Sequence, residues 1–235
     1  MVATQAVADD YACQVNTLIG TKGTGLTSGY LYPGATYPYG MVQFTPSYFS
    51  KRSGFVINQL SGGGCEHMGN FPTFPVKGKL KMSPDNILNY RINISEEKGH
   101  AGYYEAMVQE DIKAKLTVTE RTGMASYEYP ADQQYGTIII GGGISATPIE
   151  QAAIVITAPN KCEGYAEGGN FCGLRTPYKV YFVAEFDTDA LETGTWKREE
   201  LMPNTTFAEG EYSGVYFTFD VNKKKNIQYL SLIHI

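Results

Sequence analysis

Alternation of apolar and polar residues in short segments most constrains what this chain can fold into. Residues 112–119, 178–186 and 215–220 each carry an apolar side chain at every second position. Because successive side chains of a strand point to opposite faces of a sheet, each segment predicts a strand with one buried face in an antiparallel sheet. The uninterrupted apolar run 137–140 predicts a strand buried on both faces.

The rest of the chain favours the same fold class. Its 235 residues include 26 glycines, 11 prolines, 18 tyrosines and 11 phenylalanines, a composition that suits many short strands joined by turns. No segment has the pattern of a long amphipathic helix, and there is no internal repeat or linker. The sequence therefore predicts an all-β fold, a single large antiparallel β-sandwich.

Charge and hydropathy exclude two classes of partner. The formal net charge is −5, and the longest basic run is Lys223–Lys224–Lys225, so the basic surface that nucleic-acid binding needs is missing. These lysines instead predict a solvated turn or strand edge. No apolar run approaches the length of about 20 residues that crosses a membrane.

The four cysteines do not follow a zinc-binding spacing. Cys162 and Cys172 flank a short loop, so a local disulfide in an oxidising compartment is one interpretation, and free buried thiols are the other. Only His67 and His100 precede residue 230, which is too few for a histidine-rich metal site.

Both ends of the chain carry unusual sequences. Residues 6–8, Ala-Val-Ala, have the small-x-small pattern of a signal-peptidase site, so we interpret residues 1–12 as the remainder of a leader and expect an exported protein. Residues 230–235 resemble a translation of the transposase adapter used in sequencing libraries. The predicted sandwich domain accordingly covers residues 13–229.

A glycine-rich loop at residues 60–69 is the strongest candidate for a binding site. Glycine has no Cβ, so its backbone can approach a ligand closely, and polar groups follow this run directly. A tight surface loop is the alternative interpretation. Ser61 and His67 lack a third group to orient them as a catalytic pair. The candidate substrate-binding residues are Ser61, Gly62, Gly64, Cys65, Glu66 and His67.

Other glycine-rich and acidic segments carry weaker signals. Residues 15–25 lack the Gly-Lys-Ser/Thr of a phosphate-binding loop. Residues 32–43 are dense in aromatic and turn-forming residues, which suits either a glycan pocket or a turn. The glycines 141–143 predict a structural role. Seven carboxylates lie between residues 96 and 128, and nothing pairs two of them as a glycosidase requires.

Three ordered blocks resemble the amino-terminal domain of glycoside hydrolase family 92, which contains exo-acting α-mannosidases. The first block joins V-N-x-x-I-G-T-x-G-x-G at 15–25 to P-G-A-x-x-P-[FY]-G-M-V-Q-x-[ST]-P at 33–46. The second joins L-S-G-x-G-C at 60–65 to Gly69 and a proline-bearing strand at 72–78, and the third joins G-Y-Y at 102–104 to T-x-T-E-R-x-G at 117–123. The chain departs from the family at 26–30 and at Asn58–Gln59, where histidine is common.

The resemblance implies a galactose-mutarotase-like supersandwich followed by a catalytic (α/α)₆ barrel that this fragment does not reach. It also implies calcium-dependent, inverting hydrolysis of mannose-containing glycans, with the catalytic acid, the base and the Ca²⁺ ligands on the barrel. The sandwich would then contribute pocket wall and pack against the barrel, and it would be inactive alone, holding no Ca²⁺. The alternatives are a stand-alone carbohydrate-binding module and a structural cell-surface sandwich.

Overall fold

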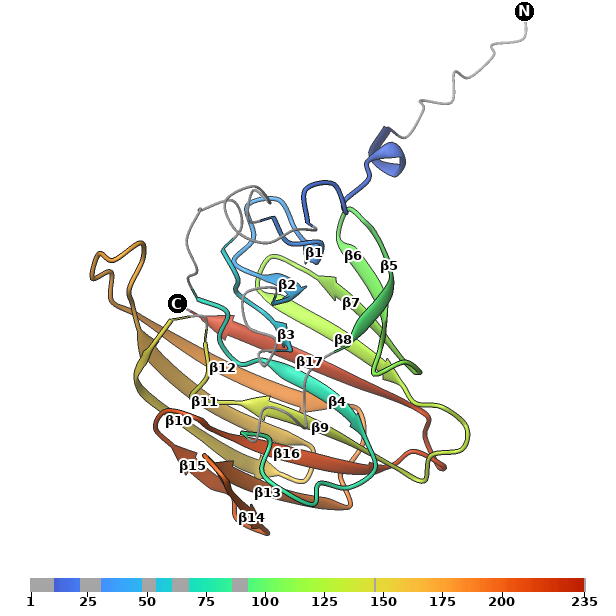
Figure 1. The fold of residues 1–235 in the computed structure, drawn as a ribbon, viewed down its shortest axis with the longest axis vertical. Coiled ribbons are helices and arrows are strands. Elements are labelled where there is room, and N and C mark those ends of the chain that lie inside the picture. Colours follow the sequence, from blue (N-terminus) through green and yellow to red (C-terminus); the bar gives the residue numbers. More distant parts are fainter. Residues whose placement is uncertain are drawn as a thin grey trace, which may run out of the picture.

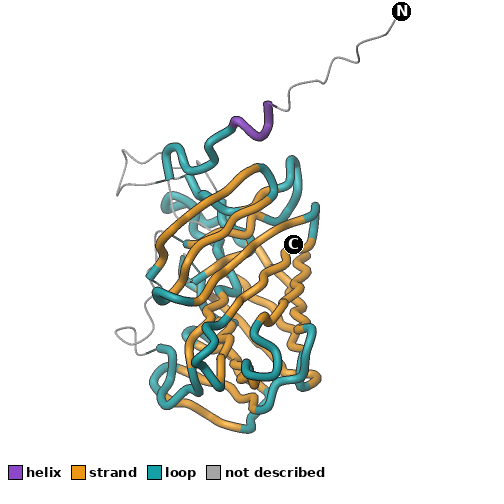
Figure 2. Tube along the Cα trace, turned by 90° about the vertical axis from the view of Figure 1, so that its right-hand side faces the viewer, coloured by secondary structure: helices purple, strands orange, loops and turns teal. Residues whose placement is uncertain are grey.

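The computed structural model describes residues 11–21, 31–47, 54–60, 68–85, 93–145 and 147–234. Within these ranges the chain forms one 3₁₀ turn, η1 (Tyr11–Gln14), and seventeen β-strands. The strands form two antiparallel sheets that pack face to face (Figure 1), and they account for most of the described trace (Figure 2). The predicted all-β fold, a large antiparallel β-sandwich, is confirmed.

The first sheet has eight strands. In spatial order they are β1 (Ala35–Thr36), β2 (Gln43–Pro46), β3 (Phe55–Val56), β4 (Thr73–Lys77), β9 (Tyr135–Gly141), β16 (Ser213–Asp220), β13 (Glu192–Lys197) and β14 (Glu200–Pro203). Its first four strands follow chain order, so β1 to β4 form one side of this sheet, with β1 at its edge.

The second sheet has nine strands. In spatial order they are β15 (Phe207–Glu209), β10 (Ile149–Ala158), β11 (Lys161–Gly168), β12 (Tyr178–Phe186), β17 (Asn226–His234), β8 (Thr122–Glu128), β7 (Ile112–Val118), β6 (Tyr103–Val108) and β5 (Ile94–His100). Strand β17 lies between β12 and β8 and thereby joins two meanders into one sheet.

The main core lies between the sheets and is built by the alternating segments. Ile112, Ala114 and Leu116 of β7 are buried, and so are the even-numbered residues 180–186 of β12. Phe186 meets the opposite sheet, where its ring centroid lies 4.9 Å from that of Phe217. Both segments are confirmed as strands with one buried face.

The prediction of one buried face is wrong for residues 215–220. Every residue of β16 except Asp220 is buried, because the outer face of the eight-stranded sheet carries a core of its own. This second cluster consists of Phe74, Val76, Ile139, Trp196 and Tyr216. The same cluster covers β9, so the predicted burial of 137–140 on both faces is confirmed.

The glycines at 141–143 have the predicted structural role. The backbone N–H groups of Gly142 and Gly143 both donate to the carbonyl of Ser213, at 2.8 and 3.0 Å. A Cβ at Gly143 would lie 1.9 Å from the carbonyl oxygen of Gly210. A side chain at this position would therefore force the two backbones apart.

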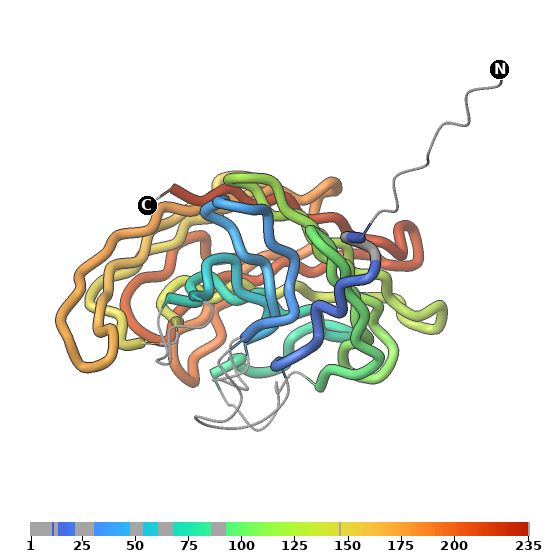
Figure 3. Tube along the Cα trace, turned by 90° about the horizontal axis from the view of Figure 1, so that it is seen from above, coloured from blue at the N-terminus to red at the C-terminus, as the bar shows by residue number. Residues whose placement is uncertain are grey.

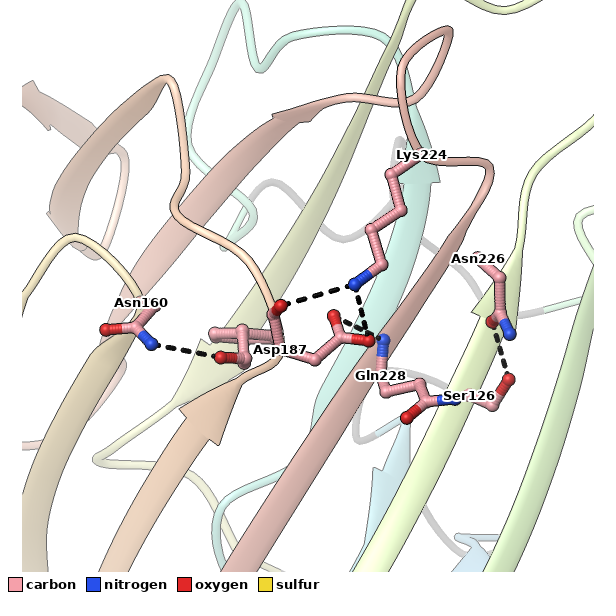
Figure 4. Close-up of polar contacts among 7 residues, drawn as sticks. Ser126, Asn160, Asp187, Lys224, Asn226 and Gln228 are labelled. Carbon is pink, nitrogen blue, oxygen red and sulfur yellow. Dashed lines mark hydrogen bonds and ion pairs between the residues drawn. The ribbon is translucent and has the colours of Figure 1, made fainter.

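Lysines 223–225 lie in the turn between β16 and β17, as predicted. Lys224 holds this turn against the end of β12, where its Nζ lies 2.7 Å from the Asp187 carboxylate (Figure 4). The same carboxylate accepts the backbone N–H of Gln228 at 3.1 Å, and Ser126 donates to Asn226 at 2.6 Å. These contacts fasten the start of β17 to both of its neighbouring strands.

Strand β17 runs through the predicted domain boundary at residue 229. It continues to His234, with Ile233 buried and Leu232 paired to both Val183 and Thr122. The adapter origin of residues 230–235 and the leader at residues 1–12 stay predictions. Within the described ranges, none of the helical structure is both long and apolar enough to span a bilayer.

Candidate functional site

The glycine-rich loop lies between two described flanks that meet at its base. The six candidate residues, Ser61, Gly62, Gly64, Cys65, Glu66 and His67, lie outside the described residues. At the flanks, Gln59 and Met68 pair in an antiparallel bridge. The ends of the loop are therefore held side by side.

Two buried asparagines clasp this base. Asn58 donates its side-chain N–H to the Asn70 side-chain oxygen at 3.0 Å, and its own oxygen accepts the Asn70 backbone N–H at 2.7 Å. Both side chains are excluded from solvent. Because a buried amide that loses its partner costs about 1–3 kcal/mol, the clasp strongly favours one geometry of the loop ends. Asn58 stands where the resembled family commonly has histidine, and here it has a structural role.

The backbone after the loop is also held in an unusual conformation. Met68, Gly69 and Phe71 all have positive φ angles, of 60°, 76° and 52°. Such angles are uncommon for residues with a Cβ and persist only where surrounding contacts hold them. One such contact is the stacking of Phe71 on Phe182 of the other sheet, at 4.3 Å between ring centroids and an interplanar angle of 8°.

Short strands bring the first sequence block beside this base. Strand β1 pairs with β2, β2 with β3, and β3 with β4, so residues 35–36 and 55–56 lie on either side of β2 in one sheet. The Gly34 N–H donates to the Thr45 hydroxyl at 3.1 Å. A Cβ on Gly34 would lie 2.2 Å from the Phe44 carbonyl oxygen, so this close approach requires glycine.

A cavity of about 260 Å³ opens at the same end of the sandwich. It lies between the segment 15–21 and the β5–β6 turn, which run alongside each other in the view from above (Figure 3). Three threonines and one imidazole supply most of its polar groups, namely Thr17, Thr21, Thr36 and His100. The Thr21 hydroxyl is bound to the Leu18 carbonyl at 2.8 Å, whereas the buried Thr17 hydroxyl has no partner within the described ranges.

His100 ends strand β5 at the wall of this cavity. Its ring stacks on Tyr103 at 4.9 Å between centroids, and Nδ1 lies 3.1 Å from the Ala101 carbonyl oxygen. When Nδ1 donates to that carbonyl, Nε2 is left as a hydrogen-bond acceptor. Sequence reasoning gave His100 no role. The position of His100, two residues before the Gly-Tyr-Tyr block, is the sequence feature that could have identified it.

The carboxylates near this end are engaged in structural contacts. Glu97 accepts the Tyr104 hydroxyl at 2.9 Å, and Glu105 accepts the Tyr103 hydroxyl at 2.7 Å. The Tyr103 hydrogen bond and the nearby Lys113 ammonium lower the pKa of Glu105, while burial and Glu105 raise the pKa of Tyr103 to about 12. A lowered pKa opposes a general-acid role, so Glu105 is not a candidate catalytic acid.

The cysteines do not form the local pair that was one interpretation of their spacing. Cys162 is a free thiol inside the core, where burial raises its pKa, and Cys172 is disulfide-bonded to a cysteine other than Cys162. The register explains this, because Cys162 pairs with Ala184 on β12 and points into the sandwich.

The described residues do not fit a calcium site. Among them, no three side chains of the His, Cys, Asp or Glu types cluster as metal ligands would. The cavity beside His100 offers hydroxyls and an imidazole without a carboxylate. Calcium binds six to eight oxygen atoms, several of them from carboxylates, so this set of groups does not suit it.

Comparison with known proteins identifies relatives over nearly the whole chain. The family profile described as "Glycosyl hydrolase family 92 N-terminal domain" matches residues 14–229. An "uncharacterized secreted glycosidase" of Arthroderma benhamiae is 31% identical over 136 residues, which cover 49% of this chain and 17% of that protein.

Solved structures share the fold. The family GH92 α-mannosidase BT3965 from Bacteroides thetaiotaomicron superposes with a TM-score of 0.80 at 23% identity, over 96% of this chain and 33% of that one. The inverting GH92 mannosidase BT2199 of the same species gives 0.77 at 20% identity, over 98% and 32%. The chain therefore spans about a third of the length of these structures.

Proposed function

The chain belongs to glycosyl hydrolase family 92, and it contains the N-terminal domain of that family. We propose that this domain contributes part of the substrate pocket of a calcium-dependent, inverting exo-α-mannosidase. The observation that carries this proposal is that the first and third sequence blocks meet at the cavity beside His100, at the end of the sandwich where the clasped loop base lies. Two similar structures are named as mannosidases, one of them as inverting, which supports the substrate class and the stereochemistry.

The groups at this end suit a sugar ring. A mannose residue presents hydroxyls that both donate and accept hydrogen bonds, and the cavity offers threonine hydroxyls and an imidazole. The Thr17 hydroxyl is buried without a partner in the described part of the chain, so a ligand hydroxyl would gain a desolvated partner there. In our proposal the loop at 61–67 closes over the same sugar.

The chemistry of hydrolysis is assigned to the barrel that follows the sandwich in the proposed full-length enzyme. Inversion needs an acid and a base about 6.5–9.5 Å apart with water between them. Near the cavity, Glu97 and Glu105 are instead held by tyrosine hydroxyls, and Glu105 also by Lys113. Calcium would also be bound by the barrel and would there orient the sugar hydroxyls. This chain's residues would bind the terminal mannose and exclude water from it.

We also propose that the protein is exported, because a relative is named a secreted glycosidase and residues 6–8 match a signal-peptidase site. An exported mannosidase would meet mannose-containing glycans outside the cytoplasm. Detection of the tagged natural gene product in the culture medium or periplasm tests this, and retention in the cytoplasm would contradict it.

Binding of methyl α-mannoside to the 235-residue chain tests the pocket. We expect weak binding, observed by two-dimensional NMR as shifts of residues 17–21 and 100–102, and at least a fivefold loss on His100→Ala. Tyr11→Ala, which alters an exposed ring on η1, is the matched control and should bind as the parent does. Unchanged binding by His100→Ala would remove this cavity from the proposal.

Activity of the natural gene, read to its stop codon, separates an enzyme from a stand-alone carbohydrate-binding module. We expect calcium-dependent release of mannose from aryl α-mannosides by that longer product, and none by residues 1–235. Turnover by the 235-residue chain would contradict the assignment of the chemistry to the barrel. A stop codon close to residue 235 would favour the module.

A further inference from the structure

An open groove lies on the outer face of the nine-stranded sheet, away from the cavity beside His100. It crosses β15, β10, β11 and β12, which lie side by side at one edge of the sheet (Figure 1). Its volume is about 380 Å³, which falls within the range of about 300–1,000 Å³ typical of small-molecule sites. No residue predicted from the sequence as a candidate contributes to it.

Small side chains form the floor of the groove and aromatic rings form its walls. Ala153 and Val155 of β10 and Val183 of β12 point outward on the two sides of β11, and their small side chains leave a depression. Phe207 of the edge strand stands on one side, opposite Val155 in register, with Tyr181 on the other. Phe207 is 52% and Tyr181 50% exposed, so the described chain leaves both rings about half open to solvent.

A second tyrosine fixes the inner wall. Tyr165 pairs with Tyr181 across β11 and β12, with ring centroids 6.4 Å apart. The Lys179 ammonium lies 4.2 Å from the Tyr165 ring centroid and is ion-paired with Glu167. The same ammonium lies 5.3 Å from the Tyr181 ring centroid, so it contacts both rings while Glu167 compensates its charge, and half of the Tyr181 side chain stays exposed to solvent.

One uncompensated polar group completes the groove. Glu163 is exposed on β11 between Val155 and Val183 and has no ion-pair partner among the described residues. A carboxylate accepts hydrogen bonds at both oxygens, so it suits a ligand rich in hydroxyl donors. An apolar surface with aromatic walls and a single free carboxylate complements an uncharged molecule that has both a hydrocarbon face and hydroxyls.

We propose that this groove is a second carbohydrate-binding site, which holds a hexopyranose unit of a glycan with its C–H face against Tyr181 and Phe207. The hydroxyls of the sugar donate to Glu163. The aromatic walls and the single carboxylate of the groove favour this ligand over a second copy of the chain. The site does not depend on the proposed mannose pocket, since the two share no residue.

Calorimetric titration of the 235-residue chain with mannohexaose, and with cellohexaose to compare sugar types, tests the proposal. We expect saturable binding of at least one of them. The double variant Tyr181→Ala/Phe207→Ala should weaken it at least tenfold, and Glu163→Gln should weaken it several-fold. Because all three side chains are exposed, the variants should keep the parental melting temperature within a few degrees.

One control separates the groove from other sites. Tyr11→Ala removes an exposed ring elsewhere and should leave binding at the groove unchanged. No binding of either hexasaccharide by the parent chain would overturn the proposal, and so would equal binding by the folded double variant. A dimer in sedimentation experiments that the double variant abolishes would identify the groove as a contact between copies, and this result would overturn it too.

Discussion

The nine-stranded sheet and the loop end of the sandwich are built on different principles. Strand β10 has ten residues and β12 has nine, and each buries alternate side chains in one continuous core. At the loop end, β1 and β3 have two residues each, and buried polar groups and glycine contacts hold them. The scaffold thus depends on many similar apolar contacts, whereas the geometry of the candidate site depends on a few specific ones.

Removing a ring from the scaffold should have the largest effect. Phe186→Ala takes away a buried ring that lies 4.9 Å from Phe217 and 5.4 Å from Tyr229, so unfolding free energy should fall by about 3–5 kcal/mol. Denaturant unfolding followed by circular dichroism measures it. Glu185→Ala, on the exposed face of the same strand, is the control. A loss below 1 kcal/mol would contradict the scaffold role of this core.

A methyl group at Gly34 should have the next largest effect. The Cβ would approach the Phe44 carbonyl at 2.2 Å, so β1 must separate from β2, and we expect a loss of about 3 kcal/mol. The control is Gly78→Ala, where a Cβ has open space and only the positive φ of 76° opposes it, at about 1 kcal/mol. Equal losses in the two variants would show that β1 accommodates a side chain.

Breaking the asparagine clasp tests the loop end through its polar contacts. Asn58→Ala leaves the Asn70 N–H buried without its acceptor and should cost about 2 kcal/mol. Asn70→Ala removes the other partner, and the double variant should cost less than the sum of the two because the residues share their bonds. Gln151→Ala, an exposed amide on β10, is the control. Strict additivity would contradict a shared clasp.

The alternation in the sequence was sufficient to predict the scaffold, because the period of two is a local property of a strand. It was insufficient for residues 215–220. Their outer face is covered by Trp196 and Phe74, which lie on other strands, and no local pattern records that cover. Burial of a second face is therefore a property of the assembled sheet.

The candidate site was only partly predictable for a related reason. The glycine-rich blocks identified which end of the sandwich to examine. The Asn58–Asn70 clasp joins residues twelve positions apart across the loop, and His100 meets Thr17 and Thr21 only because β5 runs beside the amino-terminal segment. Likewise, the spacing of Cys162 and Cys172 suggested a pair that the inward direction of Cys162 on β11 prevents.

The smallest expected effect on stability concerns Glu105, on the polar face of β5–β7 beside the cavity. Hydrogen bonding to Tyr103 and the charge of Lys113 lower the pKa of Glu105 from its usual value of about 4.5. The contacts of the ionised Glu105 therefore stabilise the fold fully above about pH 4.5, the usual pKa of a glutamate. This stabilisation is lost as the pH falls through the lower pKa that Glu105 has in the folded protein. Between about pH 5 and pH 3, the free energy of unfolding of Glu105→Gln should therefore fall less than that of the parent. The difference should be less than about 1 kcal/mol, because the lysines paired with Glu105 are solvated.

Urea midpoints measured across this pH range give that difference, and Tyr103→Phe is the informative companion. It removes the largest cause of the shift, so the acid dependence of Tyr103→Phe should lie between those of the parent and Glu105→Gln. Identical acid dependence in all three proteins would show that Glu105 contributes no pH-dependent stability. The ionic contacts at the loop end would then be marginal, and its geometry would rest on the asparagine clasp and on Gly34.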